Sequence, residues 1–423
     1  MKILIQSLNF YPELTGIGKY SGEMAFWLAS QGHEVRVITT PPYYPAWKIA
    51  PEYKKYFWSK EKQRHVVIWR CPIWVPEKPS GMTRILHLAS FALSSLPIML
   101  YQIFWRPDVV VTMEPPLFTA PTAWLTAHLC GAKSILHIQD YEVDAAFELG
   151  LLRGDRLKKL VLNIEKYLLK NFDLVSTISK RMVERALSKG LPAEKVYLFP
   201  NWADALSENQ DSPQRKETLA QASSAYRKRL GIPQDAVIAL YSGNMGAKQG
   251  LEILGEVAKK FQGRDPSLQA IYFVFCGEGI SRKALQEQCH DLSFVLFLDL
   301  QPAESLAEFL AMADIHLLPQ RADAADLVMP SKLIGMLASA RPVLACANVG
   351  TEVANIVQHC GLVVPPEDPI SFYEALAILA ADDKLRLALG LAGSEYALNH
   401  LSQEQILKSF ETRLTNLCRK AKE

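Results

Sequence analysis

Short apolar runs that alternate with helical segments are the feature of this sequence that most restricts its fold. Each run is rich in β-branched residues and apolar on both faces, as buried parallel strands are. In the first half the runs cover residues 3–8, 35–39, 66–70, 109–112, 134–138 and 174–178, with helical spacing at 21–31 and 156–171. This alternation predicts right-handed βαβ units in a doubly wound sheet.

The pattern begins again in the second half of the chain. We expect strands at 237–241, 270–276, 295–298, 315–318 and 343–345, and helices at 251–261, 303–312 and 332–339. The sequence therefore predicts an α/β protein of two Rossmann-like domains, at 1–203 and 227–402, with a cleft between them where ligands bind. A linker at 204–226, with a surface helix near its end, joins the two domains, and an amphipathic helix opens the final segment, 403–423.

Composition and charge narrow the class of protein. The chain has 423 residues, 49% apolar and 21% charged, which excludes global disorder and a coiled coil. The net charge is +2, but the first 200 residues hold 25 Lys and Arg against 17 Asp and Glu, and the remainder 21 against 27. The halves therefore have either different partners or unrelated surfaces, and no whole-chain nucleic-acid binding is expected.

Cysteine usage and the first residues indicate a cytoplasmic location. The seven cysteines form no CxxC pair or Cys/His cluster, so neither a zinc finger nor a disulfide framework is expected. The first residues, MKILIQSLNFYPE, begin a strand and are too short an apolar run for a signal peptide.

One apolar segment stands apart. Residues 85–105 contain no Asp, Glu, Lys or Arg and are long enough to cross a bilayer. A span is disfavoured because Pro97 lies in the middle and the strand at 109–112 follows at once. The alternatives are a helix docked on the first domain and a helix at the membrane surface. Basic residues upstream suit an anionic bilayer, or form a solvated face: Lys54, Lys55, Lys60, Lys62 and Arg64.

The first glycine-rich stretch, TGIGKYSG at 15–22, precedes an expected helix. Gly16 and Gly18 can let backbone amides approach a phosphate at the helix N-terminus. The spacing differs from a dinucleotide fingerprint, because seven residues separate Leu8 from Gly16 and no acid follows the second strand. NAD or FAD binding is therefore disfavoured, and a glycine turn without a ligand stays open.

The second glycine-rich stretch, YSGNMGAKQG at 241–250, joins an expected strand to an expected helix. Lys248 can neutralise a phosphate and Gln249 can donate hydrogen bonds, so the stretch predicts a diphosphate cradle without Walker spacing. The next strand ends in FCGEG at 275–279, which can supply backbone contacts to a base or a diphosphate.

Two further motifs place charge where strands end. In MPSKLIGMLASARPV, at 329–343, a serine cap precedes Lys332 at a helix start, which is a poor place for a cation unless an anion binds there. A surface lysine is the alternative.

In HIQDYEVD, at 137–144, three acids and a histidine crowd one loop, which suits acid–base chemistry. A metal site is disfavoured, because the carboxylates are close in sequence and no second histidine lies nearby.

These motifs, in this order, resemble glycosyltransferase family 4, the retaining nucleotide-sugar enzymes of GT-B fold. The resemblance covers essentially the whole chain and also includes PDVV, LVSTISKRM, PNWAD and GTEVANIV with GLVVPPEDP. The combination of IQD…DAA, GNMGAKQGLE and PSKL…MLAS looks closest to the colanic-acid-biosynthesis (WcaI-like) group, which makes bacterial exopolysaccharide. The fold implies an acceptor-binding first domain, a donor-binding second domain, and a last helix that returns to the first.

The resemblance also implies site residues. Asp140 would be catalytic, in the loop that faces the sugar. The donor would be bound by Gly16, Gly18, Asn244, Lys248, Gln249, Glu278, Ser331, Lys332 and Glu352.

The chain departs from the family at three places. Asn244 and Gln249 replace the usual basic pair, so Lys248 would supply the charge. Gln139 stands where the family often has a histidine. In the family's Glu-x7-Glu element the second glutamate falls at Gly335 and the first at Leu327, with two acids nearby as substitutes: Asp323 and Asp326.

The implied activity is retaining, metal-independent transfer of a hexosyl residue. The donor would be a GDP- or UDP-linked sugar, the acceptor a lipid-linked saccharide at the cytoplasmic face of the membrane, and no cofactor would be needed. We expect front-face attack, with the leaving phosphate taking the acceptor proton. Alternatives from other classes are a sugar-nucleotide 2-epimerase of similar fold, an NAD-dependent oxidoreductase, and a non-catalytic member of a polysaccharide assembly.

Overall fold

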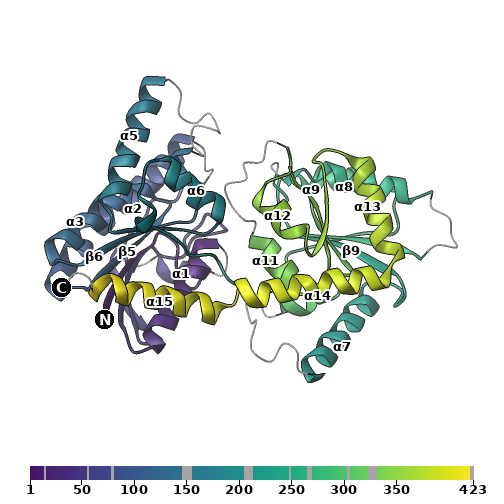
Figure 1. Cartoon of the computed structure of the whole chain (residues 1–423), viewed down its shortest axis with the longest axis horizontal. Helices are drawn as coiled ribbons and strands as arrows, with labels where there is room; N and C mark the ends of the chain where they lie inside the picture. The colour runs from purple at the N-terminus through teal and green to yellow at the C-terminus, as the bar shows by residue number, and fades with distance from the viewer. Residues whose placement is uncertain are drawn as a thin grey trace. The chain divides into compact units, whose positions relative to one another are not determined.

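The computed structural model consists of two compact units, each built around one sheet (Figure 1). The first unit comprises Met1–Asn201 and Glu404–Glu423, and the second comprises Trp202–Gln403. The structure describes residues 1–13, 16–54, 57–77, 81–144, 155–203, 213–246, 249–263, 269–302, 305–322 and 331–419.

The sheet of the first unit has eight strands in the order β3-β4-β2-β1-β5-β6-β7-β8. Neighbours pair in parallel, except that β3 and β4 are antiparallel. Strands β5 and β7 are buried along their whole length, because helices cover the sheet. The strands are β1 (Lys2–Gln6), β2 (Glu34–Thr39), β3 (Ser59–Gln63), β4 (Val66–Arg70), β5 (Val109–Glu114), β6 (Lys133–Ile138), β7 (Leu174–Thr177) and β8 (Val196–Leu198).

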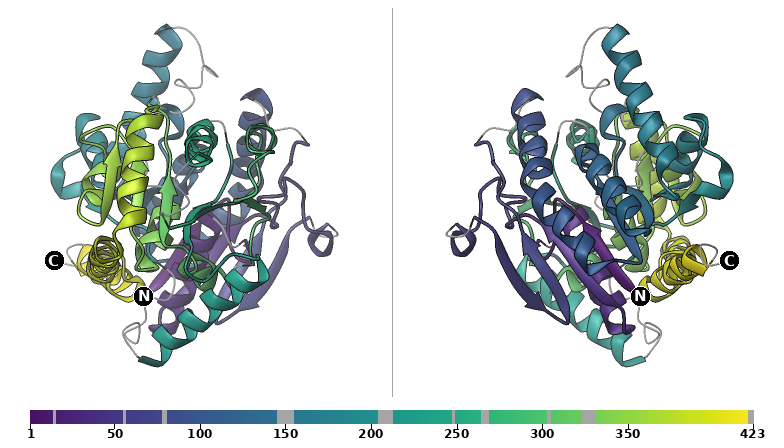
Figure 2. Two further views of the ribbon diagram at one scale, coloured as in Figure 1. Left: turned by 90° about the vertical axis from the view of Figure 1, so that its right-hand side faces the viewer. Right: turned by 90° about the vertical axis from the view of Figure 1, so that its left-hand side faces the viewer.

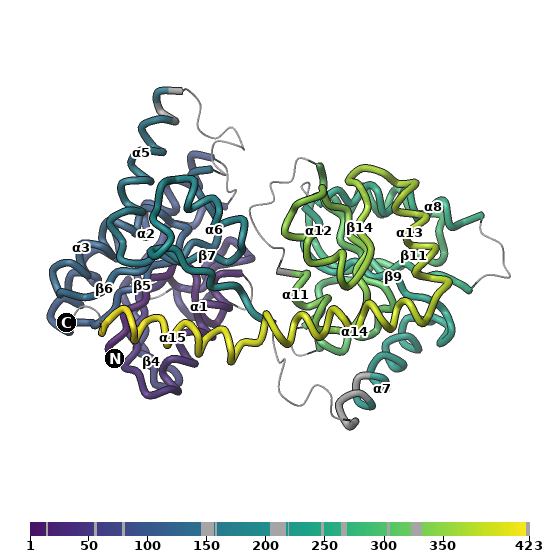
Figure 3. The backbone as a smooth tube through the Cα atoms, in the orientation of Figure 1, coloured from purple at the N-terminus to yellow at the C-terminus, as the bar shows by residue number. Residues whose placement is uncertain are grey.

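Helices connect these strands, and the last helix of the chain also packs in the first unit. The helices are α1 (Gly16–Ser30), α2 (Gly81–Tyr101), α3 (Ala120–Cys130), α5 (Asp155–Asn171), α6 (Lys180–Ser188) and α15 (Gln403–Arg419). Short 3-10 turns are η1 (Pro51–Tyr53), η2 (Gln102–Trp105), η3 (Leu117–Thr119) and η4 (Ala193–Lys195). The tube in Figure 3 follows the chain from α14 of the second unit into α15 of the first.

The sheet of the second unit has six parallel strands in the order β11-β10-β9-β12-β13-β14. They are β9 (Val237–Ser242), β10 (Ile271–Cys276), β11 (Val295–Leu298), β12 (Ile315–Leu318), β13 (Val343–Cys346) and β14 (Gly361–Val364). Its helices are α7 (Pro213–Arg229), α8 (Glu252–Phe261), α9 (Arg282–Gln288), α10 (Leu306–Ala311), α11 (Ser331–Ala338), α12 (Glu352–Val357), α13 (Pro369–Ala381) and α14 (Asp383–His400).

Both faces of this second sheet are covered, as Figure 2 shows. Alternate side chains of β9 enter different core clusters: Val237 and Ala239 pack with α8 and α13, while Ile238 and Leu240 pack against α7 and α10. Successive side chains of a strand point to opposite faces, so this division requires a layer on each side. The predicted pair of Rossmann-like α/β folds is therefore confirmed.

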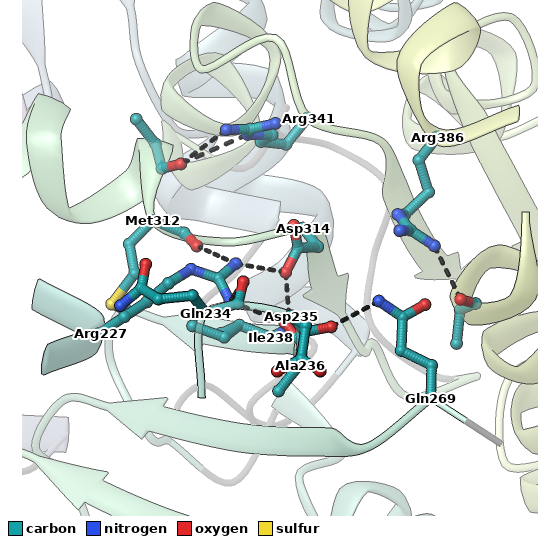
Figure 4. A network of polar contacts seen from close by, with 12 residues as sticks. Arg227, Gln234, Asp235, Ala236, Ile238, Gln269, Met312, Asp314, Arg341 and Arg386 are labelled. Carbon is teal, nitrogen blue, oxygen red and sulfur yellow. Dashed lines mark hydrogen bonds and ion pairs between the residues drawn. The ribbon is translucent and has the colours of Figure 1, made fainter. Parts of the chain in front are cut away.

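A polar network fixes the start of β9 (Figure 4). Arg227, at the end of α7, donates to Asp314 Oδ2 at 2.6 Å and to the carbonyl oxygen of Ala236 at 2.7 Å. The same carboxylate oxygen accepts from the backbone N–H of Ile238 at 2.8 Å. The network holds the strand whose other end carries the glycine-rich stretch 241–250.

Two predicted helices begin earlier in the structure than expected, and the edge strand β3 was not predicted. The helix expected near the end of the 204–226 segment begins at Pro213 and fills 213–226, because proline suits the first turn of a helix and good helix formers follow. The helix expected from residue 21 begins at Gly16. Strand β3 was not predicted, since its residues, SKEKQ, are polar and lie at a sheet edge.

Candidate functional site

Lys332 and the glycine-rich stretch after β9 form a polar cluster in the second unit. Lys332 Nζ, from the first turn of α11, donates to Gln249 Oε1 at 2.6 Å and to Tyr241 Oη at 3.0 Å. Tyr241 Oη in turn donates to the carbonyl oxygen of Asn244 at 2.6 Å. The ammonium also lies 4.6 Å from the centre of the Tyr241 ring. A cation is thus fixed beside the turn where strand β9 ends.

Burial makes this cation ready to accept an anion. It lowers the pKa of Lys332 to about 8, and the described partners of the ammonium are neutral oxygens and a ring face. A buried ammonium without a carboxylate is stabilised by any anion that reaches it. The sequence left open whether Lys332 is a surface lysine or binds an anion. In the structure Lys332 is largely buried.

The glycines of FCGEG serve the packing of two loops. A Cβ on Gly277 would lie 1.9 Å from the carbonyl oxygen of Gly243, and one on Gly279 would lie 2.4 Å from that of Met245. Both glycines also have φ near +150°, a conformation that L side chains rarely adopt. Backbone hydrogen bonds join the loops, from Met245 N to Glu278 O at 2.8 Å. Close packing of the loops accounts for both glycines.

The remaining donor candidates of the second unit lie in different settings. Asn244 is exposed, and Glu278 pairs with Arg282, which also bonds Asp299 at 2.8 Å. Glu352 is the first residue of α12, after the capping Thr351. Lys248 and the side chain of Ser331 lie outside the described residues, as do Asp323, Asp326 and Leu327.

Gly335 lies inside α11. A Cβ there would approach Leu310 Cδ1 to 3.1 Å, so a larger residue at this position requires the Leu310 side chain to shift by a small amount.

At the end of β6, Gln139 bonds two polar side chains of the first unit, Asn201 and His137. It exchanges two hydrogen bonds of 3.0 Å with Asn201, and its Nε2 lies 2.9 Å from His137 Nε2. Burial lowers the pKa of His137 to about 3, so the ring is neutral and its other nitrogen donates to Ser176 Oγ at 3.0 Å. Asp140 follows Gln139 directly and is partly exposed. Asn201 was not among the predicted site residues, although PNWAD was part of the resemblance.

The other acids of HIQDYEVD have structural partners. Asp144 bonds Arg185 at 2.9 Å and Lys189 at 3.1 Å, and these cations hold the pKa of Asp144 low against the effect of burial. Glu142 accepts from the backbone N–H of Leu117 at 2.8 Å. These contacts give Asp144 and Glu142 structural roles, and the structure places Asp140 directly after the buried Gln139.

Glu114 is a buried acid that the sequence did not single out. It ends β5, is fully buried, and neither carboxyl oxygen has a hydrogen-bond partner within the part of the chain described. Burial raises its pKa well above the usual value, and nearby Glu165 and Glu142 raise it further. Burial and the neighbouring acids therefore favour the neutral form of this side chain.

Gly16 and Gly18 occupy the first turn of α1. Gly16 has φ +56° with open space around a Cβ, whereas a Cβ on Gly18 would lie 2.8 Å from Glu13 Cβ. Glu13 is buried there and accepts from the backbone N–H groups of Tyr43 and Tyr44, both at 2.9 Å. Gly18 thus makes room for Glu13, while Gly16 allows the left-handed turn into the helix.

The apolar segment 85–105 forms most of α2 and η2. One face of α2 enters the core, where Leu88, Phe91 and Met99 pack with strands of the sheet. The opposite face is an exposed apolar stripe, which we call the α2 stripe: Met82, Leu86, Leu93, Leu100 and, in η2, Phe104. Leu93 is 72% and Phe104 85% exposed. Helical spacing places the four α2 residues on one side, so the stripe is continuous.

By length and composition α2 with η2, Gly81–Trp105, is the helix of the described chain that could cross a membrane. The buried face argues against a span, because crossing would withdraw core residues from the sheet. The described residues also contain no group of three or more His, Cys, Asp or Glu that could hold a metal ion.

Comparisons with known proteins identify relatives of both units. Residues 15–202 match the model of the glycosyl transferase 4-like domain, and residues 236–382 match that of the glycosyl transferases group 1. WcaI of Escherichia coli strain K12, a glycosyl transferase named for colanic acid biosynthesis, is 40% identical over 419 residues, with 97% of this chain and 98% of that protein covered.

Solved structures share the fold over the whole chain. Sucrose-phosphate synthase from Thermosynechococcus elongatus has a TM-score of 0.73 at 18% identity, with 99% of each chain covered. Anabaena HepE, in complex with UDP and glucose, has a TM-score of 0.67 at 12% identity, with 98% of this chain and 100% of that chain covered.

Proposed function

The chain belongs to the glycosyltransferases, and from that premise we propose that it moves a hexosyl residue from a nucleoside-diphosphate sugar to a lipid-linked saccharide, with retention of configuration, in bacterial polysaccharide synthesis. The observation that carries the proposal is Lys332, a largely buried cation with neutral partners beside a glycine-rich turn. The nucleotide in the HepE complexes and the colanic acid assignment of WcaI support the same donor class and pathway class.

The donor diphosphate is the ligand that this cation fits. Its charge would replace the amide oxygen of Gln249 as the partner of Lys332 Nζ, and Asn244 and Gln249 would then donate to phosphate oxygens. Lys248 is proposed to add a second positive charge. Glu278, Ser331 and Glu352 are proposed to contact the rest of the donor, and Gly16 and Gly18 of the first unit to contact its diphosphate.

Catalysis would depend on stabilising the leaving group. Bond cleavage leaves an oxocarbenium-like sugar and a diphosphate, and fixed positive charge lowers the energy of that separation. We propose that lysine charge and helix N-termini do this without a metal ion or a cofactor. The leaving phosphate oxygen would take the acceptor proton on the same face of the sugar, and Asp140 would orient the acceptor.

The acceptor is proposed to lie in a membrane, with the protein held at its cytoplasmic surface. The α2 stripe presents leucine, methionine and phenylalanine to the outside, and Lys60 and Lys62 are exposed on β3. Strand β3 lies near α2, because Trp58 Nε1 donates to the carbonyl oxygen of Ser94 at 3.1 Å. Apolar side chains beside basic ones are what an anionic lipid surface binds.

A thermal-shift panel tests the donor assignment. The purified protein is heated with UDP, GDP, their sugars or NAD(H), with and without Mg²⁺, because a ligand of the folded state raises the Tm. We expect a metal-independent rise with one nucleoside diphosphate, and its loss in Lys332→Met but not in the exposed-lysine control Lys283→Met. A rise with NAD(H) alone, or an undiminished rise in Lys332→Met, would contradict the proposal.

A further inference from the structure

Gln139 and Asn201 hold the chain where it leaves the first unit. Asn201 Nδ2 donates to Gln139 Oε1, and Gln139 Nε2 donates to Asn201 Oδ1, both at 3.0 Å. Asn201 is the last residue of the first unit before Trp202 begins the second. We call these two side chains the amide pair. It is an anchor on the first-unit side of the crossing.

On the second-unit side, the chain is fixed within two residues of Asn201. Trp202 is buried, and the backbone N–H of Ala203 donates to the carbonyl oxygen of Leu401 at 3.0 Å. Ala203 also forms a parallel bridge with Ser402. Any rotation between the units at this crossing is therefore confined to the few backbone bonds between Asn201 and Ala203.

The return crossing has a comparable anchor. The chain re-enters the first unit between Gln403 and Glu404, and Glu404 Oε2 accepts from Trp27 Nε1 at 2.8 Å. Trp27 lies on α1, the helix that begins at Gly16. The two crossings are bound to each other inside the second unit, and each is tied by a side chain to an element that leads to the proposed site.

The amide pair leads directly to the end of β6. The backbone N–H of Gln139 donates to the carbonyl oxygen of Glu114 at 2.8 Å, and its side chain contacts His137, so the residue is fixed to two neighbouring strands. Asp140 is the next residue. A displacement of Asn201 would therefore be passed to the backbone of Asp140 through the amide pair alone.

We propose that the amide pair is a positioning contact that couples rotation at the 201–203 crossing to the placement of Asp140. Gln139 and Asn201 are positioning residues, and the significance of Asp140 rests on the proposed function. The four groups in the chain, Ser176, His137, Gln139 and Asn201, carry no charge near pH 7, because burial lowers the pKa of His137 to about 3.

Single-molecule energy transfer on the full chain tests the coupling without any nucleotide. Genetically encoded labels at the exposed Lys170 and Lys384 report the distribution of distances between the units. The variants are Gln139→Met, Asn201→Leu, their double, and the swap Gln139→Asn with Asn201→Gln, which keeps both amides and their combined length. Asn171→Leu, at a half-buried residue of α5 whose amide bonds only the carbonyl oxygen of Tyr167, is the control.

We expect both single variants and the double to broaden the distribution equally, because each removes the same contact. The swap should restore the wild-type width, and the control should not change it. Hydrogen exchange of the peptide 139–144 should become about tenfold faster in the single variants, as loss of ordinary hydrogen bonds implies. Faster exchange with an unchanged distance distribution would overturn the proposal, since the pair would then be only local structure.

The donor measurement keeps the two proposals separate. A protein that binds neither UDP nor GDP would overturn the proposed function, while the distance measurement would still decide the coupling. If turnover is observed, we expect Asn201→Leu to lower kcat with an unchanged Kd for the nucleotide, and the swap to recover kcat. A fall in nucleotide affinity with unchanged kcat would count against a positioning role.

Discussion

Lys332 Nζ lies 2.6 Å from Gln249 Oε1, so that a largely buried ammonium has an uncharged amide as its shortest contact. The two residues come from α11 and from the end of the glycine-rich stretch after β9. An amide oxygen satisfies a hydrogen bond but leaves the charge uncompensated. An anion can therefore replace the Gln249 amide as the partner of Lys332, and anion binding should depend on pH.

Nucleotide affinity should fall as pH rises above about 8. The pKa of Lys332 is about 8 in the free protein, and a bound diphosphate raises it, so binding above that pH requires proton uptake. The loss is at most about tenfold per pH unit. Titration calorimetry of UDP or GDP at pH 6.5 and 8.8, in buffers of different ionisation enthalpy, measures the uptake.

The variant Lys332→Met separates this lysine from other charges. We expect nucleotide binding about 10- to 100-fold weaker at pH 7, the contribution of one charge-assisted hydrogen bond, and no remaining proton uptake at pH 8.8. Lys283→Met, at an exposed position on α9, should keep both properties of the wild type. Equal proton uptake in Lys332→Met would assign the titration to another group.

Glu114→Gln should stabilise the protein at neutral and alkaline pH. The folded-state pKa of Glu114 is raised above the ordinary 4.5, so the wild type loses stability as pH rises between the two values, where only the unfolded state ionises. The gain from the variant should grow by about 1.4 kcal/mol per pH unit over that range. Urea unfolding at pH 5, 6.5 and 8 measures it, with the exposed Glu184→Gln as a control that shows no trend.

Gly277→Ala should destabilise the second unit and weaken nucleotide binding together. The new methyl group would meet the carbonyl oxygen of Gly243, and alanine disfavours φ +146°. We expect a loss of about 2 kcal/mol or more, as at other positions that need glycine. Gly263→Ala, where a Cβ meets nothing within 4 Å, is the matched control for thermal unfolding. Equal Tm values for the two variants would refute the loop-packing explanation.

Replacing Leu93, in the α2 stripe, by glutamate should release the protein from lipid vesicles. In flotation with vesicles containing phosphatidylglycerol, Leu93→Glu puts charge into the α2 stripe and should reduce the bound fraction about tenfold or more. Leu391→Glu, at an exposed leucine on α14, should bind as the wild type does. Equal flotation of both variants would exclude the stripe. A wild type that does not float but dimerises through the stripe would indicate a second copy as its partner.

Hydrophobic periodicity was enough to find the buried strands. Strand β9 was expected at 237–241 and is Val237–Ser242, because most residues of a doubly covered strand are apolar. The last helix was expected at 403–419 and has those bounds. Strands β3, β8 and β14 were missed. β3 is polar and exposed, and β8 (VYL) and β14 (GLVV) are too short for a repeating pattern.

The site could be predicted only in part, because its contacts join distant segments. Lys332 was selected as a cation in an unfavourable place, but its partners Gln249 and Tyr241 are 83 and 91 residues away in sequence. FCGEG was expected to supply backbone contacts to a ligand, and the structure adds a second reason for its glycines, the close packing of two loops. Gln139 was noticed only as a departure from the family, since nothing local reveals its bonds to Asn201, 62 residues later.

Helix α15 has a consequence for the order in which the chain can fold. Phe410 stacks on Phe199 with ring centres 4.1 Å apart, and Leu407 and Leu414 are buried in the first unit. On the ribosome, these side chains emerge only after the whole second unit has been made. The second unit can therefore fold while the first still waits with an open apolar surface. The N-terminal unit, although synthesised first, can complete this part of its core only after α15 has left the ribosome.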